Sequence, residues 1–84
     1  MSYSIYKLFG SFWQGKFMVG GFKSLKNAKE RCAEIISHYP IVAIVDLEIW
    51  DTDAKRPVGW MHSDYKGEKG IFYEDRKGNV TKMR

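Results

Sequence analysis

One amphipathic helix, set between two groups of short apolar runs, constrains the fold of this chain most. Ser24 is a favourable N-cap residue, and after it apolar side chains recur at steps of three and four residues: Leu25, Ala28, Cys32, Ile35, Ile36 and Tyr39. The other face is polar and carries Lys26, Asn27, Lys29, Glu30, Arg31, Glu34 and His38. Such a helix must bury its apolar stripe against another layer, and Pro40 predicts where it ends.

The segments on both sides of this helix have strand patterns. Residues 3–9 and 16–22 are rich in β-forming side chains with turn residues between them, which predicts a hairpin. Residues 41–50 alternate, so that Ala43, Val45, Leu47 and Ile49 fall on one face, and we expect them to form a central strand packed against the helix. A turn at 51–56, a strand at 58–62 entered through Pro57, a loop at 63–70 and a last hairpin of strands 71–74 and 79–83 complete the prediction.

The order β-β-α-β-β-β-β predicts an α+β fold: an antiparallel sheet of about five to six strands with one helix packed on one face. The 84 residues have room for one core, so we expect a single domain over residues 1–84. One helix cannot cover every strand. We therefore expect the uncovered face to expose aromatic side chains from the set Tyr6, Trp13, Trp50, Trp60, Phe72 and Tyr73.

Composition limits the class of protein. A hydrophobic content of 44% with 15% aromatic residues predicts a packed core and not a disordered chain. Cys32 is the only cysteine, which excludes an internal disulfide and a cysteine-based zinc site and indicates a reducing compartment, so we predict a cytoplasmic location. The start of the chain lacks the apolar run of a signal peptide, and no apolar run is long enough to cross a membrane. We expect no cofactor and no membrane partner.

The net charge of +4 is unevenly distributed along the chain. Residues 1–31 are basic, residues 32–64 are acidic and residues 65–84 are basic again. A nucleic-acid-binding protein would be expected to gather its basic groups on one continuous face. The sequence alone does not show whether the two basic segments meet in space.

The stretch GKFMVGGFKS, residues 15–24, mixes glycines and lysines but fits no phosphate-binding motif. A P-loop needs its lysine directly after the second glycine, and the dinucleotide and RRM patterns also miss their register here. We predict instead that Gly20 and Gly21 form a bulge where a strand bends into the helix, with Phe17, Val19 and Phe22 in the core.

Two sets of residues are weak candidates for chemistry. Four acids, Asp46, Glu48, Asp51 and Asp53, suggest a two-metal hydrolase, but only Asp46 and Glu48 share a strand face, while the other two lie in a predicted turn. Cys32 lies on the apolar stripe and His38 on the polar side of the helix, which is a poor geometry for a catalytic pair, and we expect Cys32 in the core. We expect His62 in a loop or at the rim of the sheet.

Basic and aromatic residues give the best candidates for binding. Lys16, Lys23, Lys26, Lys29 and Arg31 follow the second strand into the polar helix face and could meet phosphates or an acidic protein. Trp13, Trp50 and Trp60 could bind a protein partner or stack on bases. We take these eight residues as the predicted partner-binding set.

The segment from Phe22 to Ile36, FKSLKNAKERCAEII, is followed by a Val/Ile strand and then by Asp51, Thr52 and Asp53. This pattern resembles small α+β proteins encoded by phages and mobile elements, some of which are anti-CRISPR or host-takeover inhibitors that occupy a surface of a larger complex. The resemblance covers residues 15–62 and carries over no functional residue. The basic balance of this chain departs from members that mimic DNA by acidity.

This resemblance, together with many large aromatics and no specific catalytic motif, predicts a small non-enzymatic binding protein. It would act through an aromatic and basic surface on a protein or ribonucleoprotein partner, and the resemblance implies the role of a phage-encoded inhibitor. The first alternative is a nucleic-acid-binding module that uses the basic face from Lys16 to Arg31. A metal-dependent hydrolase using Asp46 and Glu48 is the least favoured alternative.

Overall fold

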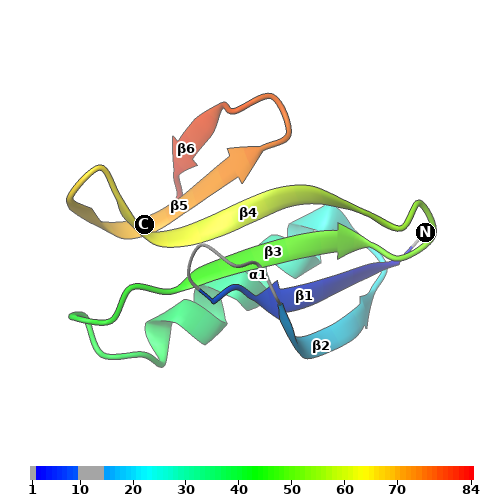
Figure 1. Ribbon diagram of the computed structural model, residues 1–84, viewed down its shortest axis with the longest axis horizontal. Helices are drawn as coiled ribbons and strands as arrows, with labels where there is room; N and C mark the ends of the chain where they lie inside the picture. The colour runs from blue at the N-terminus through cyan, green and yellow to red at the C-terminus, as the bar shows by residue number, and fades with distance from the viewer. Residues whose placement is uncertain (1, 10–14) are drawn as a thin grey trace.

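The computed structural model describes residues 2–9 and 15–84 of the protein. In this part of the chain a six-stranded antiparallel sheet of strand order β2-β1-β3-β4-β5-β6 packs against one helix (Figure 1). The elements are β1 Tyr3–Lys7, β2 Lys16–Phe22, α1 Leu25–Ser37, β3 Asp46–Asp51, β4 Arg56–Tyr65, β5 Glu68–Asp75 and β6 Val80–Lys82. The predicted α+β class, element order and helix position are confirmed, while Trp13 and the turn residues around it lie outside the described residues.

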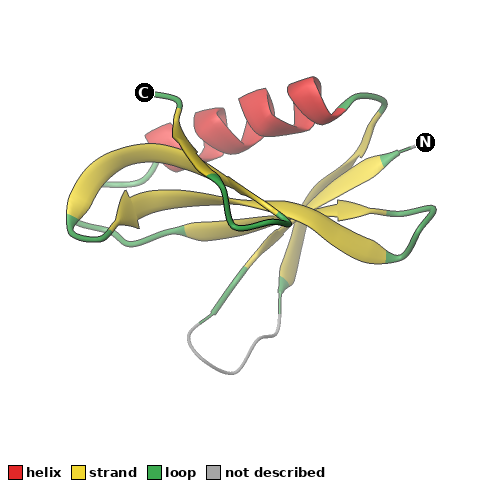
Figure 2. Ribbon diagram, turned by 90° about the horizontal axis from the view of Figure 1, so that it is seen from above, coloured by secondary structure: helices red, strands yellow, loops and turns green. Residues whose placement is uncertain are grey.

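The sheet is built around β1, which pairs with β2 on one side and β3 on the other. After the β1–β2 hairpin the chain crosses the sheet as α1 and returns as β3 beyond β1, and strands β3 to β6 then follow one another as a meander. Figure 2 shows that α1 lies along one face of the sheet. The strands therefore have a face that packs on the helix and an opposite face.

The helix forms where the apolar pattern predicts it. Ser24 is the N-cap, and its hydroxyl oxygen accepts a hydrogen bond from the backbone N–H of Asn27 at 3.1 Å, which satisfies one of the free donors of the first turn. Ala28, Cys32, Ala33 and Ile36 are the buried residues of α1. They share one core with the most completely buried residues of the sheet and of the segment leading into β3: Ile5, Val45, Leu47, Ile49 and Met61. The helical stripe and one face of the sheet thus form a single core.

The predicted strand at 41–50 is wrong in its first half, because β3 begins only at Asp46. The backbone N–H of Ala43 donates to the carbonyl of Pro40 at 2.9 Å, which makes a turn directly after the helix. The N–H of Val45 then donates to the Ser63 hydroxyl at 2.7 Å, so that a side chain takes the place of a ladder partner. The predicted inward face is correct nonetheless, since Val45, Leu47 and Ile49 are all buried in the core.

The predicted loop at 63–70 is also wrong. Strand β4 runs on to Tyr65 and β5 begins at Glu68, so only Lys66 and Gly67 connect them. Both have positive φ, 52° and 85°, as a two-residue type I′ hairpin requires. The polar residues before and after this turn are paired across β4 and β5, with Tyr65 opposite Glu68 and Asp64 opposite Lys69. Polarity here reflects strand faces outside the core and not a loop.

The stretch GKFMVGGFKS contains the predicted bulge. Tyr3 is paired with Phe22 and Ile5 with Val19, so β2 carries one residue more than β1 in this interval. Gly21 has φ of 85°, and a Cβ atom on Gly20 would lie 2.8 Å from the Ser4 hydroxyl oxygen. The glycine prediction is confirmed, but Phe17 is not in the core. It is 55% exposed, because it lies on the sheet face away from α1.

Candidate functional site

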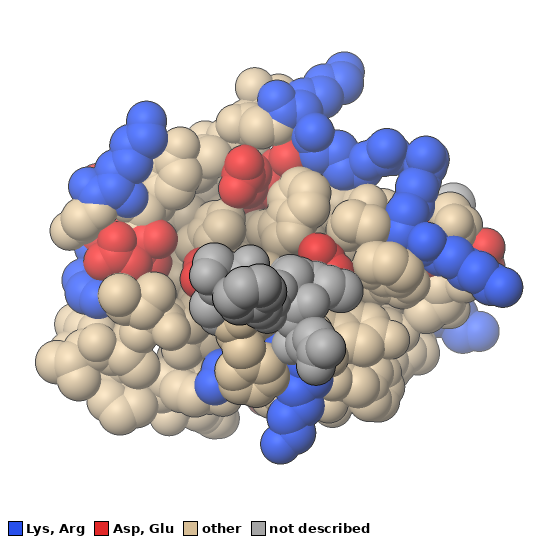
Figure 3. Space-filling view, viewed as in Figure 1, with Lys and Arg blue, Asp and Glu red and all other residues tan. Residues whose placement is uncertain are grey.

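Alternate residues of the strands point away from α1 and form a surface that we call the open face. Its members are Tyr6, Phe17, Asp46, Glu48, Trp50, Trp60, His62 and Glu74. Figure 3 looks onto this side of the molecule and shows acidic side chains in patches within it and lysines and arginines around its rim. Among the described residues, the open face therefore combines aromatic and acidic side chains.

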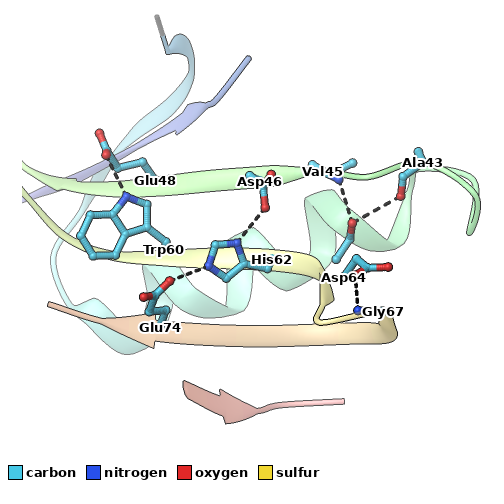
Figure 4. Close-up of polar contacts among 10 residues, drawn as sticks. Ala43, Val45, Asp46, Glu48, Trp60, His62, Asp64, Gly67 and Glu74 are labelled. Carbon is cyan, nitrogen blue, oxygen red and sulfur yellow. Dashed lines mark hydrogen bonds and ion pairs between the residues drawn. The ribbon is translucent and has the colours of Figure 1, made fainter. Parts of the chain in front are cut away.

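His62 lies in the middle of β4 and contacts a carboxylate on each neighbouring strand (Figure 4). Its Nδ1 is 2.7 Å from Asp46 Oδ1, and its Nε2 is 2.9 Å from Glu74 Oε1. The hydrogen bond with Asp46 and the contact with Glu74 raise the pKa of His62 against the opposing effect of burial. The expected loop or rim position is thus wrong, since the continuation of β4 to Tyr65 places His62 inside the sheet.

This arrangement determines what the His62 ring can do. In the imidazolium form both ring nitrogens donate to carboxylates, so neither is available as a general base or as a metal ligand. Within residues 2–9 and 15–84 no three His, Cys, Asp or Glu side chains are grouped to hold a metal ion. Asp46, one of the two residues considered for a hydrolase, is engaged by His62. The site links β3, β4 and β5 through charge-assisted hydrogen bonds.

Glu48 lies beside this group and is the most deeply buried acid on the open face. It is 4% exposed, and its Oε2 accepts a hydrogen bond from the Trp60 indole Nε1–H at 2.9 Å. Its Oε1 is buried and has no hydrogen-bond partner within residues 2–9 and 15–84. Burial raises the pKa of the Glu48 carboxyl, and the hydrogen bond from Trp60 partly opposes that shift. Glu48 is therefore a buried acid that is only half satisfied.

Aromatic side chains surround Glu48. Tyr6 and Trp60 are its direct partners on β1 and β4, and Trp50 is the next residue on the same face of β3. The rings of Tyr6 and Trp50 meet edge to face with centroids 6.2 Å apart. Of the predicted tryptophans, the structure thus brings Trp50 and Trp60 to one surface, and Trp13 lies outside the described residues.

The two other aromatics expected on the uncovered face are buried. Tyr73 points toward α1 and is 7% exposed in the core, so that expectation is wrong. Phe72 lies on the opposite side of β5 and is nevertheless buried, because the Tyr65 ring covers it at 5.7 Å between centroids. The exposed aromatic surface therefore includes neither Phe72 nor Tyr73 and is smaller than the sequence predicts.

The predicted basic residues are spread over the molecule. Lys16 begins β2 and Lys23 directly follows its last residue, so about 20 Å separates them at the rise of a strand. Lys26, Lys29 and Arg31 lie on α1, across the sheet from the two tryptophans. Arg31 pairs with Glu34 at 2.5 Å. Among the residues that the structure describes, the basic and the aromatic members of the predicted set do not form one surface.

The two basic segments of the chain do approach each other at one place. The Nζ atom of Lys29 lies 3.9 Å from the centroid of the Tyr73 ring. Tyr73 also lines a surface pocket together with Arg76 and Lys77 from the β5–β6 turn. Basic side chains from the first and last thirds of the chain therefore share one edge of the molecule.

A second candidate surface lies at the C-terminal end of α1, on the side of the sheet that the helix covers. A pocket of about 450 Å³ opens between the helix end, the segment after Pro40 and the edge of β5 and β6. We call this region the end surface; it comprises Ile36, Tyr39, Ile41, Val42, Ile44, Ile71, Lys69, Lys82 and Arg84. Ile41, Val42 and Ile44 are 78%, 82% and 69% exposed.

Sequence reasoning missed the end surface because it assigned residues 41–45 to a buried strand. The sequence signal for it is Pro40 directly before the apolar run Ile41 to Val45, because a proline there favours a turn. In the structure this turn, closed by the Ala43 N–H and the Pro40 carbonyl, interrupts the strand alternation.

Comparison with known proteins adds no relative: no protein-family model, no curated protein and no solved structure matches this chain at a significant level. Within the described residues, no helix has the length and apolar character needed to span a membrane.

Proposed function

We propose that this protein is a non-enzymatic binding protein that docks a segment of a protein partner on the end surface. The observation that carries the proposal is the exposure of Ile41, Val42 and Ile44 beside a pocket of about 450 Å³. Large apolar side chains gathered on the surface of a small protein are characteristic of interaction sites, and a pocket of this size can take the side chains of a bound peptide.

The charges around the pocket indicate the chemistry of the partner. The apolar lining residues Ile36, Tyr39 and Ile71 are buried or half-buried. The basic lining residues Lys69, Lys82 and Arg84 are exposed, and we call them the basic rim. Lys69 and Lys82 are paired with Asp64 and Glu68, and such exposed pairs are weak enough to exchange partners. A segment with apolar side chains flanked by acidic ones complements this surface.

The state of the reactive side chains supports binding over catalysis. His62 has both ring nitrogens engaged by carboxylates. Cys32 is fully buried, and burial raises the pKa of its thiol to about 12, so the nucleophilic thiolate is scarce at neutral pH. The surface that we propose for the partner is apolar with a basic rim, in place of the aromatic and basic surface expected from the sequence. An origin among phage-encoded inhibitors stays a prediction.

Selection of peptides from a displayed random library tests this proposal. The wild-type protein should enrich peptides that combine Asp or Glu with large apolar residues, and the double variant Ile41→Ser/Val42→Ser should lose them. Phe17→Ser, which also removes an exposed apolar side chain but on the open face, is the matched control and should bind as the wild type does. Enrichment of no common pattern, or equal binding by the double variant, would count against the proposal. Self-association of the protein through the end surface, without binding of any peptide, would also count against it.

Nucleic-acid binding is the second candidate function, and the meeting of the two basic segments around Tyr73 favours it. This function predicts affinity for RNA or DNA that falls steeply with salt, because phosphate contacts release counterions. Fluorescence anisotropy with labelled oligonucleotides at several salt concentrations measures this slope. The double variant Lys29→Ala/Lys77→Ala should flatten the slope, and the absence of binding at low salt would remove this candidate.

A further inference from the structure

A second binding site is indicated on the open face, across the sheet from α1, by the incomplete hydrogen bonding of Glu48. Glu48 is 4% exposed, and Trp60 donates a hydrogen bond only to its Oε2. Oε1 has no donor among the described residues. A buried carboxylate oxygen without a donor costs free energy, and this cost falls when a cationic donor is supplied.

The side chains around Glu48 suit a cation. Tyr6 and Trp60 flank it on the neighbouring strands and Trp50 follows it on β3, so three π-systems border the carboxylate. On the fourth side Asp46 shares the His62 ring with Glu74. Two carboxylates thus contact the imidazolium and Glu48 adds a third beside them, so the local charge is negative. Aromatic rings beside a negative charge attract cations and repel phosphate.

We propose that Glu48, Tyr6, Trp50 and Trp60 form a binding site for the guanidinium group of an arginine side chain from a partner polypeptide. Because Oε1 is buried, a ligand reaches it only when a bordering aromatic side chain moves aside. A guanidinium is planar, so it can then lie against an aromatic ring and donate an in-plane N–H to Glu48 Oε1. A lysine ammonium is more strongly hydrated and offers no flat face to the rings. The site differs from the end surface in position and charge, so either can exist without the other.

The indole Nε1–H of Trp60 provides a direct reporter, because it donates to the same carboxylate. In a ¹⁵N-labelled sample this resonance should shift saturably with N-acetyl-arginine amide, with a dissociation constant on the order of millimolar for so small a ligand. N-acetyl-citrulline amide has the same shape without the charge and should cause no saturable shift. The lysine analogue should bind several-fold more weakly than the arginine probe.

Variants separate the site from a general charge effect. Glu48→Gln should abolish the saturable shift, whereas Glu34→Gln, the same change on the polar face of α1, should leave it intact. Trp50→Leu keeps Glu48 and the Trp60 reporter and should weaken binding several-fold, which retains a test if Glu48→Gln does not fold. An equal response to citrulline, an unchanged response in Glu48→Gln, or a shift caused by an oligonucleotide and not by the arginine probe would overturn the proposal.

Discussion

At the residue scale, His62 links three adjacent strands. Its ring contacts Asp46 on β3 and Glu74 on β5 from a central position on β4. The site is half-buried, so the two contacts are screened less than pairs in open solvent. Protonation of His62 therefore strengthens the side-chain contacts that link three of the six strands.

The stability of the protein should fall as the pH rises through the raised pKa of His62. A group whose pKa is higher in the folded state stabilises the fold fully below its unfolded pKa of 6.5, and this contribution is lost as the pH rises above it through the folded value. The variant His62→Gln should lack this part of the pH dependence. Urea unfolding from pH 6.5 upward, compared with the exposed control His38→Gln, measures the difference. Parallel pH profiles for wild type and His62→Gln would contradict the assignment.

Cys32 should react with thiol reagents only when the protein opens. Its side chain is completely buried between α1 and the sheet, and burial raises its pKa to about 12. Labelling by a chromogenic disulfide should therefore be slow in native buffer and should accelerate in denaturant in step with the unfolded fraction. Labelling in native buffer at the rate of a free cysteine would show that the helix separates from the sheet without global unfolding.

At the element scale, the β4–β5 hairpin depends on an unusual turn residue. Lys66 adopts φ of 52°, a conformation in which asparagine is favoured over lysine, and Gly67 follows at 85°. We expect Lys66→Asn to raise the free energy of unfolding by about 0.5 kcal/mol and Gly67→Ala to lower it by about 1 kcal/mol. Chemical denaturation of the two variants tests this. Opposite signs would mean that the turn relaxes to another type.

The elements that the sequence predicts well are those whose pattern is local. The helix is predicted because its signals are local: Leu25, Ala28 and Cys32 recur at steps of three and four residues, and Ser24 caps the first turn. The extent of β4 and β5 is not, because Lys66 and Gly67 resemble no common I′ pair and the strand residues around them are polar. A strand whose outward side chains meet water has the composition of a loop, and only cross-strand pairing distinguishes the two.

The candidate sites depend on information between elements. The alternation of residues in β3 places Asp46 and Glu48 on one face, as predicted. Their partners His62 and Trp60 follow from the β3–β4 register, which local sequence does not specify. The residue types of the open face were therefore predictable, whereas the pairing that leaves Glu48 half satisfied was not.

At the scale of the whole molecule, topology separates groups that lie close in the sequence. The crossover through α1 puts its basic side chains on one side of the sheet, while Trp50 and Trp60 face the other side beside carboxylates. The net charge of +4 is therefore a poor guide to the charge of either side of the sheet. A partner that meets the open face meets aromatic and acidic groups, and one that meets the end surface meets apolar groups with a basic rim.

The apolar side chains of the end surface should be dispensable for folding, which is what their assignment to a partner requires. Ile41 and Val42 lose little contact with water on folding, so Ile41→Ser/Val42→Ser should change the free energy of unfolding by no more than about 0.5 kcal/mol. Val45, only a few residues further on, is 2% exposed, and Val45→Ala should cost about 2 kcal/mol. Urea denaturation of both variants measures the contrast. If the double variant were as unstable as Val45→Ala, these side chains would be part of the core, and their exposure would no longer argue for a partner.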